Sequence, residues 1–239
     1  MARGNNIRLT RLRNKLNEMA NDVFKSDEYR HFFSIPLTRE RAAYYILERS
    51  HFHLNRRQCW ALVQSKAPFD VKQLIWDHER EELAGDIERG VENHWVLGMK
   101  EGMTVGLKSR DFKGLPSDIT KVCTYAWAHI AETVPWLEAV SASGILEIAN
   151  SDEVVKGGGV ARRVAKKLTR ELGIPLRAQH SNREHVVVDV EHAHLLMRVA
   201  GDHVRSKEDA DMVIRGAANS LAINRTWLGL MADRMEHLN

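Results

Sequence analysis

The stretch "HVVVDVEHAH", residues 185–194, decides how this chain folds, because its residues favour two different secondary structures. Three consecutive valines are typical of a β-strand. His185, Asp189 and His192 instead recur at the three- and four-residue spacing of an α-helix. On a helix these three side chains project from one face, whereas His194 points about 180° away from His185. A helix here would therefore gather two imidazoles and a carboxylate on one side.

The residues just before this stretch predict where such a helix begins. "SNRE", residues 181–184, has the pattern of a capping box. Ser181 can accept a hydrogen bond from the Glu184 amide while the Glu184 carboxylate reaches back to the Ser181 amide. The valines cost only about a few tenths of a kcal/mol each relative to alanine, and burial of one face offsets that cost. We therefore predict a helix over residues 181–200.

The rest of the chain shows the same periodicity, with apolar residues recurring at three and four positions rather than at two. Prolines and glycines fall mostly between these segments, and neither an internal repeat nor a long linker interrupts them. The sequence predicts an all-α fold in a single domain over residues 1–239. The other expected helices cover residues 5–26, 38–64, 68–89, 91–107, 118–133, 136–150, 153–172 and 206–237.

Composition excludes several classes of protein. Apolar residues make up 44% of the chain and charged residues 28%, with a net charge of +3 and no apolar run long enough to span a bilayer. The basic segment at 161–173 is interpreted as a solvated helix face, so we expect neither nucleic acid nor a membrane as a partner. Cys59 and Cys123 lack the C-x-x-C spacing of a redox or zinc motif. We expect a cytoplasmic protein with reduced thiols.

Two other segments carry candidate metal ligands. "SGILEIAN", residues 143–150, sets Glu147 among apolar neighbours, where a carboxylate is rarely found unless it is paired or bound to metal. Inward Glu and His side chains in a four-helix core are how di-iron carboxylate sites are built. By their residue types alone, these groups could equally form a hydrogen-bonded core network. The segment "DHEREELAGDIERGVENHWVL", residues 77–97, offers His78, Glu79, Glu81, Glu82 and His94.

Three segments carry a resemblance to a known superfamily: "VPWLEAVSASGILEIAN" (134–150), "DVEH" (189–192) and "GVENHWVLGM" (90–99). From about residue 40 to its end the chain resembles the heme-oxygenase-like proteins that include the oxidase PqqC and the thiaminase TenA. One branch, the heme-oxygenase-like diiron oxidases and oxygenases similar to the Chlamydia CADD protein, carries the helix motif H-x-x-x-D-x-x-H. His185, Asp189 and His192 match that motif. The resemblance implies a heme-oxygenase-like bundle of seven to nine helices.

The resemblance also implies a ligand set. The family places a Glu a little over fifty residues after a His, which pairs His94 with Glu147, and an earlier Glu in a stretch like "EELAGD", which makes Glu82 a ligand. The gap between Glu82 and His94 is longer than in most relatives, so Glu81, Glu79 and His78 remain alternatives. The implied metal ligands are Glu82, His94, Glu147, His185, Asp189 and His192, of which Glu82, Glu147 and Asp189 are also expected to be catalytic.

The resemblance further implies an O2-dependent enzyme with two ferrous ions. The expected reaction is N-oxygenation, desaturation or C–C cleavage of a small amine, amino acid or fatty-acid-like substrate, whose carboxylate Arg183 or Arg198 could hold. Besides the substrate, a second copy of the chain and an external electron donor are expected partners. The alternatives are a cofactor-independent oxidase or hydrolase of the PqqC and TenA kind acting on a small aromatic substrate, and a non-catalytic binding protein. His185 argues against the first alternative, because the metal-free relatives share only "DVEH".

Overall fold

The computed structural model describes residues 2–239, with side chains over residues 7–186 and 192–239. Helices account for all of the regular secondary structure in this part of the chain, apart from one isolated bridge between Asp86 and Val91. The all-α prediction is therefore confirmed. The α-helices are α1 (Ala2–Asp22), α2 (Asp27–Ser34), α3 (Arg39–Lys66), α4 (Phe69–Ala84), α5 (His94–Met103), α6 (Asp118–Thr133), α7 (Trp136–Asn150), α8 (Val160–Leu172), α9 (His180–His203) and α10 (Lys207–Glu236), joined by the short 3-10 helices η1 (Val23–Lys25), η2 (Asp111–Lys113) and η3 (Leu176–Ala178).

Ten α-helices slightly exceed the expected seven to nine, and helix α2 is the one that the sequence analysis missed. This short helix lies where a break was expected. The Ser26 side chain accepts a hydrogen bond from the Tyr29 amide and so caps its first turn. Tyr29 and Phe32 are buried on its inner face, and α2 packs against α10. Tertiary burial thus stabilises a segment that is too short to be a helix alone.

Helix α4 also ends earlier than expected, at Ala84 rather than near residue 89. Gly85 follows with a φ of +81°, and a Cβ at this position would lie 2.3 Å from the carbonyl oxygen of Val91. Only glycine tolerates both the backbone angle and the close approach. The chain then turns back on itself, and α5 begins at His94 after Asn93, whose side chain caps it.

Helix α9 confirms the helical interpretation of the opening stretch, but the predicted capping box is wrong. The helix begins at His180 with Gln179 as the N-cap residue, and no side chain caps it. Ser181 is instead buried within the first turn, and its Oγ has no hydrogen-bond partner among the side chains that the structure describes. Glu184 accepts a hydrogen bond from Arg89 in the loop before α5. A long-range ion pair between Arg89 and Glu184 therefore takes the place of the predicted local capping hydrogen bonds.

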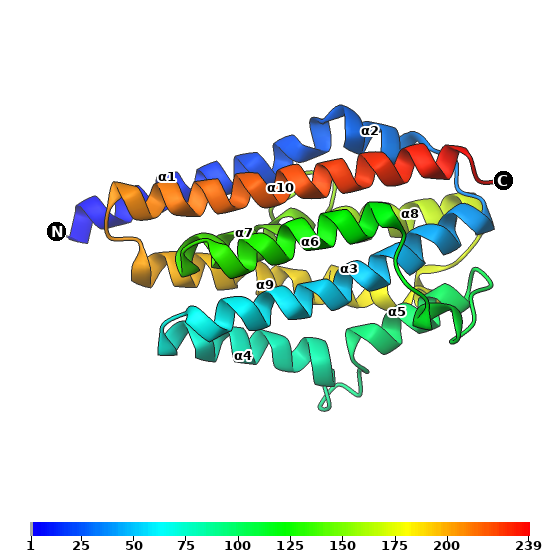
Figure 1. Ribbon diagram of the computed structural model, residues 1–239, viewed down its shortest axis with the longest axis horizontal. Helices are drawn as coiled ribbons and strands as arrows, with labels where there is room; N and C mark the ends of the chain where they lie inside the picture. The colour runs from blue at the N-terminus through cyan, green and yellow to red at the C-terminus, as the bar shows by residue number, and fades with distance from the viewer. Residues whose placement is uncertain (1) are drawn as a thin grey trace.

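Helix α7 lies at the centre of the bundle and contacts α3, α6, α9 and α10 (Figure 1). Almost all of its side chains are buried. Two glycines allow close contact with its neighbours: a Cβ on Gly144 would lie 2.9 Å from the Leu196 Cβ of α9, and one on Gly216 of α10 would lie 2.1 Å from the Glu138 carbonyl oxygen. A side chain projecting from α7 therefore meets the other helices in the core.

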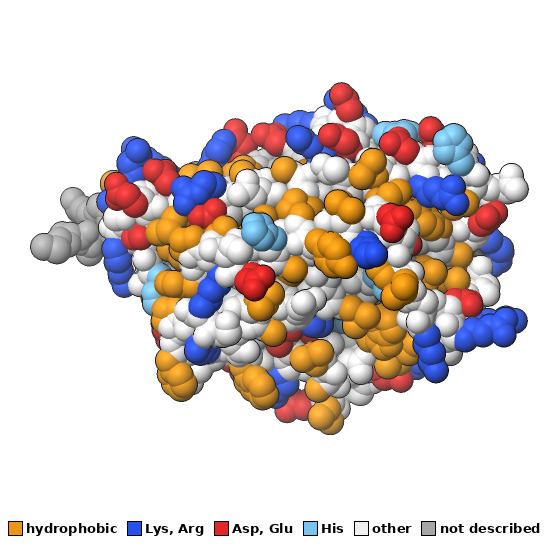
Figure 2. All heavy atoms as spheres, in the orientation of Figure 1, with side chains coloured by type: hydrophobic (Ala, Val, Ile, Leu, Met, Phe, Trp, Pro, Cys, Tyr) orange, Lys and Arg blue, Asp and Glu red, His pale blue; other side chains and the backbone are white. Residues whose placement is uncertain are grey.

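The face shown in Figure 2 carries charged side chains with hydrophobic ones between them. Across the described helices, none combines the length and the apolar character that a membrane span requires.

Candidate metal centre

Four helices, α4, α5, α7 and α9, contribute buried imidazole and carboxylate side chains that gather in one cluster. Each of these side chains is buried, and buried ionisable groups are costly unless they are paired or bind a metal. The sequence-predicted members and their exposed fractions are Glu82 (7%), His94 (6%), Glu147 (8%), His185 (7%) and His192 (5%), and His78 (5%) joins them.

One part of the cluster joins three helices through His78 of α4, Glu147 of α7 and His192 of α9. Each offers one ligand atom, and these atoms all lie within 4.8 Å of one another. The His78 Nε2 atom is 3.8 Å from Glu147 Oε1, and the centroids of the two imidazole rings are 4.3 Å apart. Two imidazoles and a carboxylate facing one point form a donor set that suits iron.

The second part of the cluster contains Glu82, His94 and His185. Glu82 Oε2 lies 3.0 Å from His94 Nδ1, and the rings of His94 and His185 are 4.6 Å apart. The other oxygen of Glu82, Oε1, lies 3.7 Å from His192 Nδ1. Glu82 therefore lies between the two parts of the cluster, with one oxygen near a histidine of each.

The longer gap between Glu82 and His94 does not keep them apart. Because the chain reverses at Gly85, the first residue of α5 returns beside the last turn of α4. The two fallback carboxylates have other positions. Glu79 Oε1 lies 3.0 Å from His78 Nδ1, while Glu81 Oε2 lies 3.3 Å from His192 Nε2 at the edge of the cluster.

Glu79 gives His78 a defined role. A metal-binding histidine almost always donates its other ring N–H to a carboxylate or carbonyl, and Glu79 is such an acceptor for Nδ1. That hydrogen bond leaves Nε2 directed toward Glu147. Among the described residues Nε2 finds no hydrogen-bond partner although it is buried, which costs free energy unless it binds something. The residues present therefore fit a metal ion at this point.

The structure also places two arginines in the cluster that the sequence analysis missed. Arg56 Nη2 donates to Glu147 Oε1 at 2.5 Å. Arg57 Nη1 lies 2.9 Å from both Glu79 Oε1 and Glu82 Oε2. A signal was present in the sequence, because Arg56 shares a helical face with Cys59, Trp60 and Val63, all of which are buried.

These positive charges control the pKa values of the carboxyl groups. Burial by itself would raise the pKa of Glu147, but the charges of Arg56, His78 and His192 outweigh it and lower the pKa from 4.5 to about 2. Burial likewise opposes ionisation of Glu82, yet Arg57 and His94 hold its pKa well below the usual range. Both carboxyl groups are therefore ionised at neutral pH, as metal ligands must be.

Asp189 lies in α9, but its side chain is outside the described residues, as are those of its neighbours from 187 to 191. Five of the six predicted ligands meet in one cluster, with His78 as a sixth described member. The assignment of individual ligands stays a prediction. His194, on the other face of α9, is exposed.

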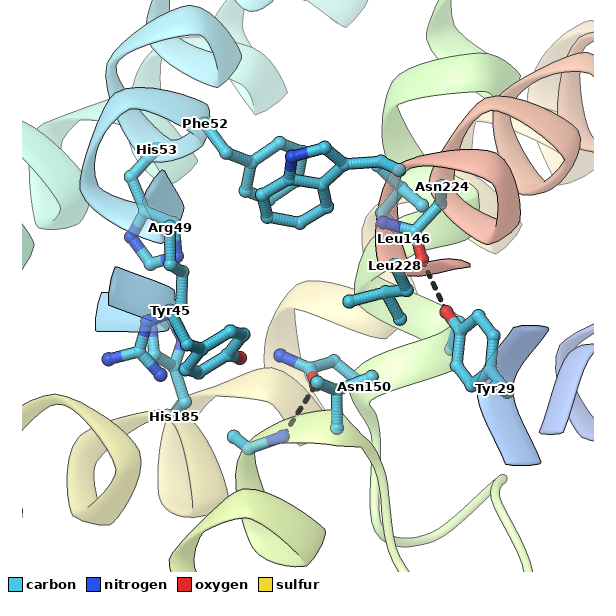
Figure 3. Close-up of a pocket in the computed structure, with 14 residues that line it drawn as sticks. Tyr29, Tyr45, Arg49, Phe52, His53, Leu146, Asn150, His185, Asn224 and Leu228 are labelled. Atoms are coloured by element: carbon cyan, nitrogen blue, oxygen red, sulfur yellow. Dashed lines mark hydrogen bonds between the residues drawn. The ribbon is translucent and has the colours of Figure 1, made fainter. Parts of the chain in front are cut away.

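Several cavities adjoin the cluster, and two of them reach different members of it. The inner cavity, of about 70 Å³, has mostly apolar and aromatic walls, and His53 and His185 border it on the side of the cluster (Figure 3). The outer pocket, of about 380 Å³, reaches His78 and His192, and its lining includes charged residues. The inner cavity's other walls include Tyr29, Tyr45, Phe52, Leu146, Trp227 and Leu228, and the outer pocket's include Asp77, Glu81, His194 and Arg198.

The two arginines proposed from the sequence to hold a substrate carboxylate differ in position. Arg198 lines the outer pocket, as His192 does. Arg183 is exposed, and neither cavity includes it among its lining residues. Of the two, only Arg198 is placed to meet a molecule that approaches the cluster.

The comparison with protein families identifies the class of protein. A family described as "Iron-containing redox enzyme" matches residues 43–225, more than half of the chain. The chain therefore belongs to this family. No curated protein matches it.

Solved structures with the same fold come from several organisms. A domain of unknown function with a heme oxygenase-like fold from Shewanella denitrificans has a TM-score of 0.75 at 19% identity, covering 95% of this chain and 93% of its own. A CADD-like protein of unknown function from Nostoc punctiforme has a TM-score of 0.72 at 17% identity, covering 95% and 98%. A TenA homologue from P. horikoshii has a TM-score of 0.59 at 15% identity, covering 92% and 98%. These likenesses confirm the heme-oxygenase-like fold.

Proposed function

We propose that this protein is a non-heme diiron oxidase or oxygenase that uses O2 to oxidise a small organic substrate. The observation that carries the proposal is the convergence of His78, Glu147 and His192 within 4.8 Å, with Glu82 and His94 directly beside them. Membership of an iron-containing redox family supports the choice of metal. The proposed iron ligands are Glu82, His94, Glu147, His185, Asp189 and His192, with His78 as a competitor for one of these places.

Two ferrous ions would supply the electrons and the open coordination positions that O2 activation requires. The chain's own residues hold the geometry. Glu79 fixes the tautomer of His78 by accepting from its Nδ1–H, so that Nε2 faces the cluster. Glu82 lies between the two parts of the cluster and holds them at a fixed separation through its contacts with His94 and His192. Burial of all these groups excludes bulk water and strengthens every charge interaction among them.

The inner cavity is the proposed position of the substrate's reacting part. It lies against His185, and its walls are apolar apart from a few polar groups (Figure 3). The guanidinium of Arg49, which also lines it, is already committed to Glu101 and Asn182. The cavity therefore suits a compact, largely apolar group better than a carboxylate. A substrate carboxylate would find Arg198 in the outer pocket instead.

The cofactor-independent alternative is weaker on two grounds. A TenA-like hydrolase needs a nucleophilic thiol, whereas burial raises the pKa of the Cys59 thiol to about 11 and also raises that of Cys123. A metal-free oxidase would leave the buried Nε2 of His78 without purpose. The two cysteines and His78 are therefore less consistent with a thiol-dependent hydrolase or a metal-free oxidase than with an iron enzyme.

Anaerobic loading with ferrous iron, followed by metal analysis, tests the proposal. We expect close to two iron ions per chain, and O2 consumption on exposure to air-saturated buffer. Screening amino acids, amines and fatty acids for increased O2 consumption would then identify the substrate class. A protein that retains no iron after desalting and consumes no O2 would contradict the proposal and favour a metal-free function.

A further inference from the structure

Two consecutive arginines of α3 lie against the two carboxylates that the proposed function assigns to iron. Arg56 donates to Glu147 at 2.5 Å, and both side chains are at least 89% buried. Arg57 lies 2.9 Å from Glu82, whose side chain alone is 5% exposed. Since successive helical residues differ by about 100° in direction, the pair can serve two different carboxylates. Each carboxylate thus has its own guanidinium.

The guanidinium groups and the imidazoles approach the carboxylate oxygens together. Glu147 Oε1 accepts from Arg56 and also lies 3.8 Å from His78 Nε2. Glu82 Oε2 lies 2.9 Å from Arg57 and 3.0 Å from His94. A metal ion bound by these same oxygens would add a second cation beside each guanidinium, and like charges this close repel strongly inside a protein.

Arg57 has a second feature that fits this competition. Its Nε and Nη1 atoms are buried but make no hydrogen bond of acceptable geometry to the described residues. The contact with Glu79 and Glu82 is therefore mainly one of charge. A counter-ion held by charge alone is released more easily than one held by a directional, bidentate hydrogen bond.

We propose that Arg56 and Arg57 are built-in counter-ions that stabilise Glu147 and Glu82 in the metal-free protein and compete with iron for the same oxygens. This inference rests on the proposed function. The two arginines are positioning residues. Their charges lower the affinity of the site for iron. Before iron binds, the same charges keep the buried carboxylates ionised and the bundle folded.

The test compares wild-type protein with Arg56→Gln. The affinity for ferrous iron is measured anaerobically by competition with a chelator, and the melting temperature is measured without metal. Arg56→Gln should bind iron at least about tenfold more tightly, because one competing charge is gone. Its metal-free melting temperature should fall by about 5–10 °C, because a buried ion pair is broken. Arg56→Lys keeps the charge and should retain an affinity near that of wild type.

A matched control lies on the same helix. Arg49 forms a similarly buried pair at 2.7 Å with Glu101, which is not one of the candidate ligands. Arg49→Gln should lower the melting temperature by a comparable amount and leave the iron affinity unchanged. If Arg56→Gln lowers the melting temperature and tightens iron binding, while Arg49→Gln only lowers the melting temperature, then Arg56 competes with iron and is not merely structural.

Two further measurements apply even if Arg56→Gln does not fold. Arg57→Gln should also tighten iron binding. In a crystal structure of iron-loaded wild-type protein, Arg56 Nη2 should have moved out of hydrogen-bond distance of Glu147 Oε1. Unchanged or weaker iron affinity in the Gln variants, or an intact Arg56–Glu147 pair beside bound iron, would overturn the inference alone. Absence of iron binding in wild type and all variants would overturn the proposed function and the inference with it.

Discussion

Two buried polar clusters share helix α3 and differ in how completely they are satisfied. The first, here called the closed cluster, consists of Arg49, Glu101, Gln179 and Asn182. Arg49 donates to Glu101 and to Asn182, and the backbone amide of Asn182 donates to the second oxygen of Glu101. The Asn182 side chain donates in turn to Gln179. Each charged or amide side chain in this cluster has hydrogen-bond partners within the protein.

The candidate metal centre, two turns further along α3, is the open counterpart. His78 Nε2 and His94 Nδ1 are buried without a hydrogen bond of acceptable geometry to the described residues, and so is Arg57 Nη1. Native proteins rarely leave buried polar atoms unmatched. The difference teaches that burial of charge alone does not mark a functional site. A functional site is indicated by buried polar atoms that face one another without forming hydrogen bonds.

Breaking the closed cluster should have the largest effect on stability. Glu101→Gln keeps the shape of the side chain but leaves the buried guanidinium of Arg49 without a counter-charge. We expect a loss of about 3–5 kcal/mol in the free energy of unfolding, measured with denaturant. Iron affinity should not change. The exposed Glu40→Gln, at the start of the same helix, serves as the control, and a loss below about 1 kcal/mol in Glu101→Gln would contradict the structural role.

Acid should weaken the open cluster through Glu147. Its pKa is about 2 in the folded protein against 4.5 for the free group, so its charge stabilises the fold above pH 4.5 and this contribution is lost as the pH falls toward 2. The contribution is about 3 kcal/mol. Unfolding of metal-free wild type and Glu147→Gln should therefore be compared from pH 6 to pH 3. The stability difference should shrink over this range, and a constant difference would contradict the assigned pKa.

Removal of a predicted ligand should affect iron rather than folding. His192→Ala should weaken ferrous iron binding by more than about a hundredfold, because losing a ligand exceeds the loss of a supporting residue. The helical circular dichroism should stay near that of wild type. His194→Ala, two residues later on the exposed face of α9, should bind iron normally. Equal iron affinity in the two variants would contradict the assignment of His192.

The smallest expected effect concerns the residue that orients His78. Glu79→Ala removes the acceptor of the His78 Nδ1–H and one of the two carboxylates beside Arg57. Iron affinity should fall by about tenfold, measured by the same chelator competition. The exposed Glu132→Ala on α6 is the control. An unchanged affinity would show that His78 is not a ligand and that the site relies on the other histidines.

Much of the fold could be predicted because helical periodicity is a local property. The helix around "HVVVDVEHAH" was identified from spacing, and so were α6 and α7 with their bounds. The start of that helix was predicted to within one residue, but its capping box was wrong, because Glu184 pairs with Arg89 instead. Helix α2 was missed because its stability comes from packing against α10. Local signals therefore identified the elements better than their ends.

The sequence by itself determined which residue types could bind a metal and that His185, Asp189 and His192 share one helical face, because both follow from chemistry and a 3.6-residue period. Only the tertiary structure brought Glu82 back beside His94 and set Arg56 against Glu147. Those contacts depend on a chain reversal at one glycine and on the packing of α3 against α7. Contacts between helices depend on how all of them pack together, and no local pattern encodes that arrangement.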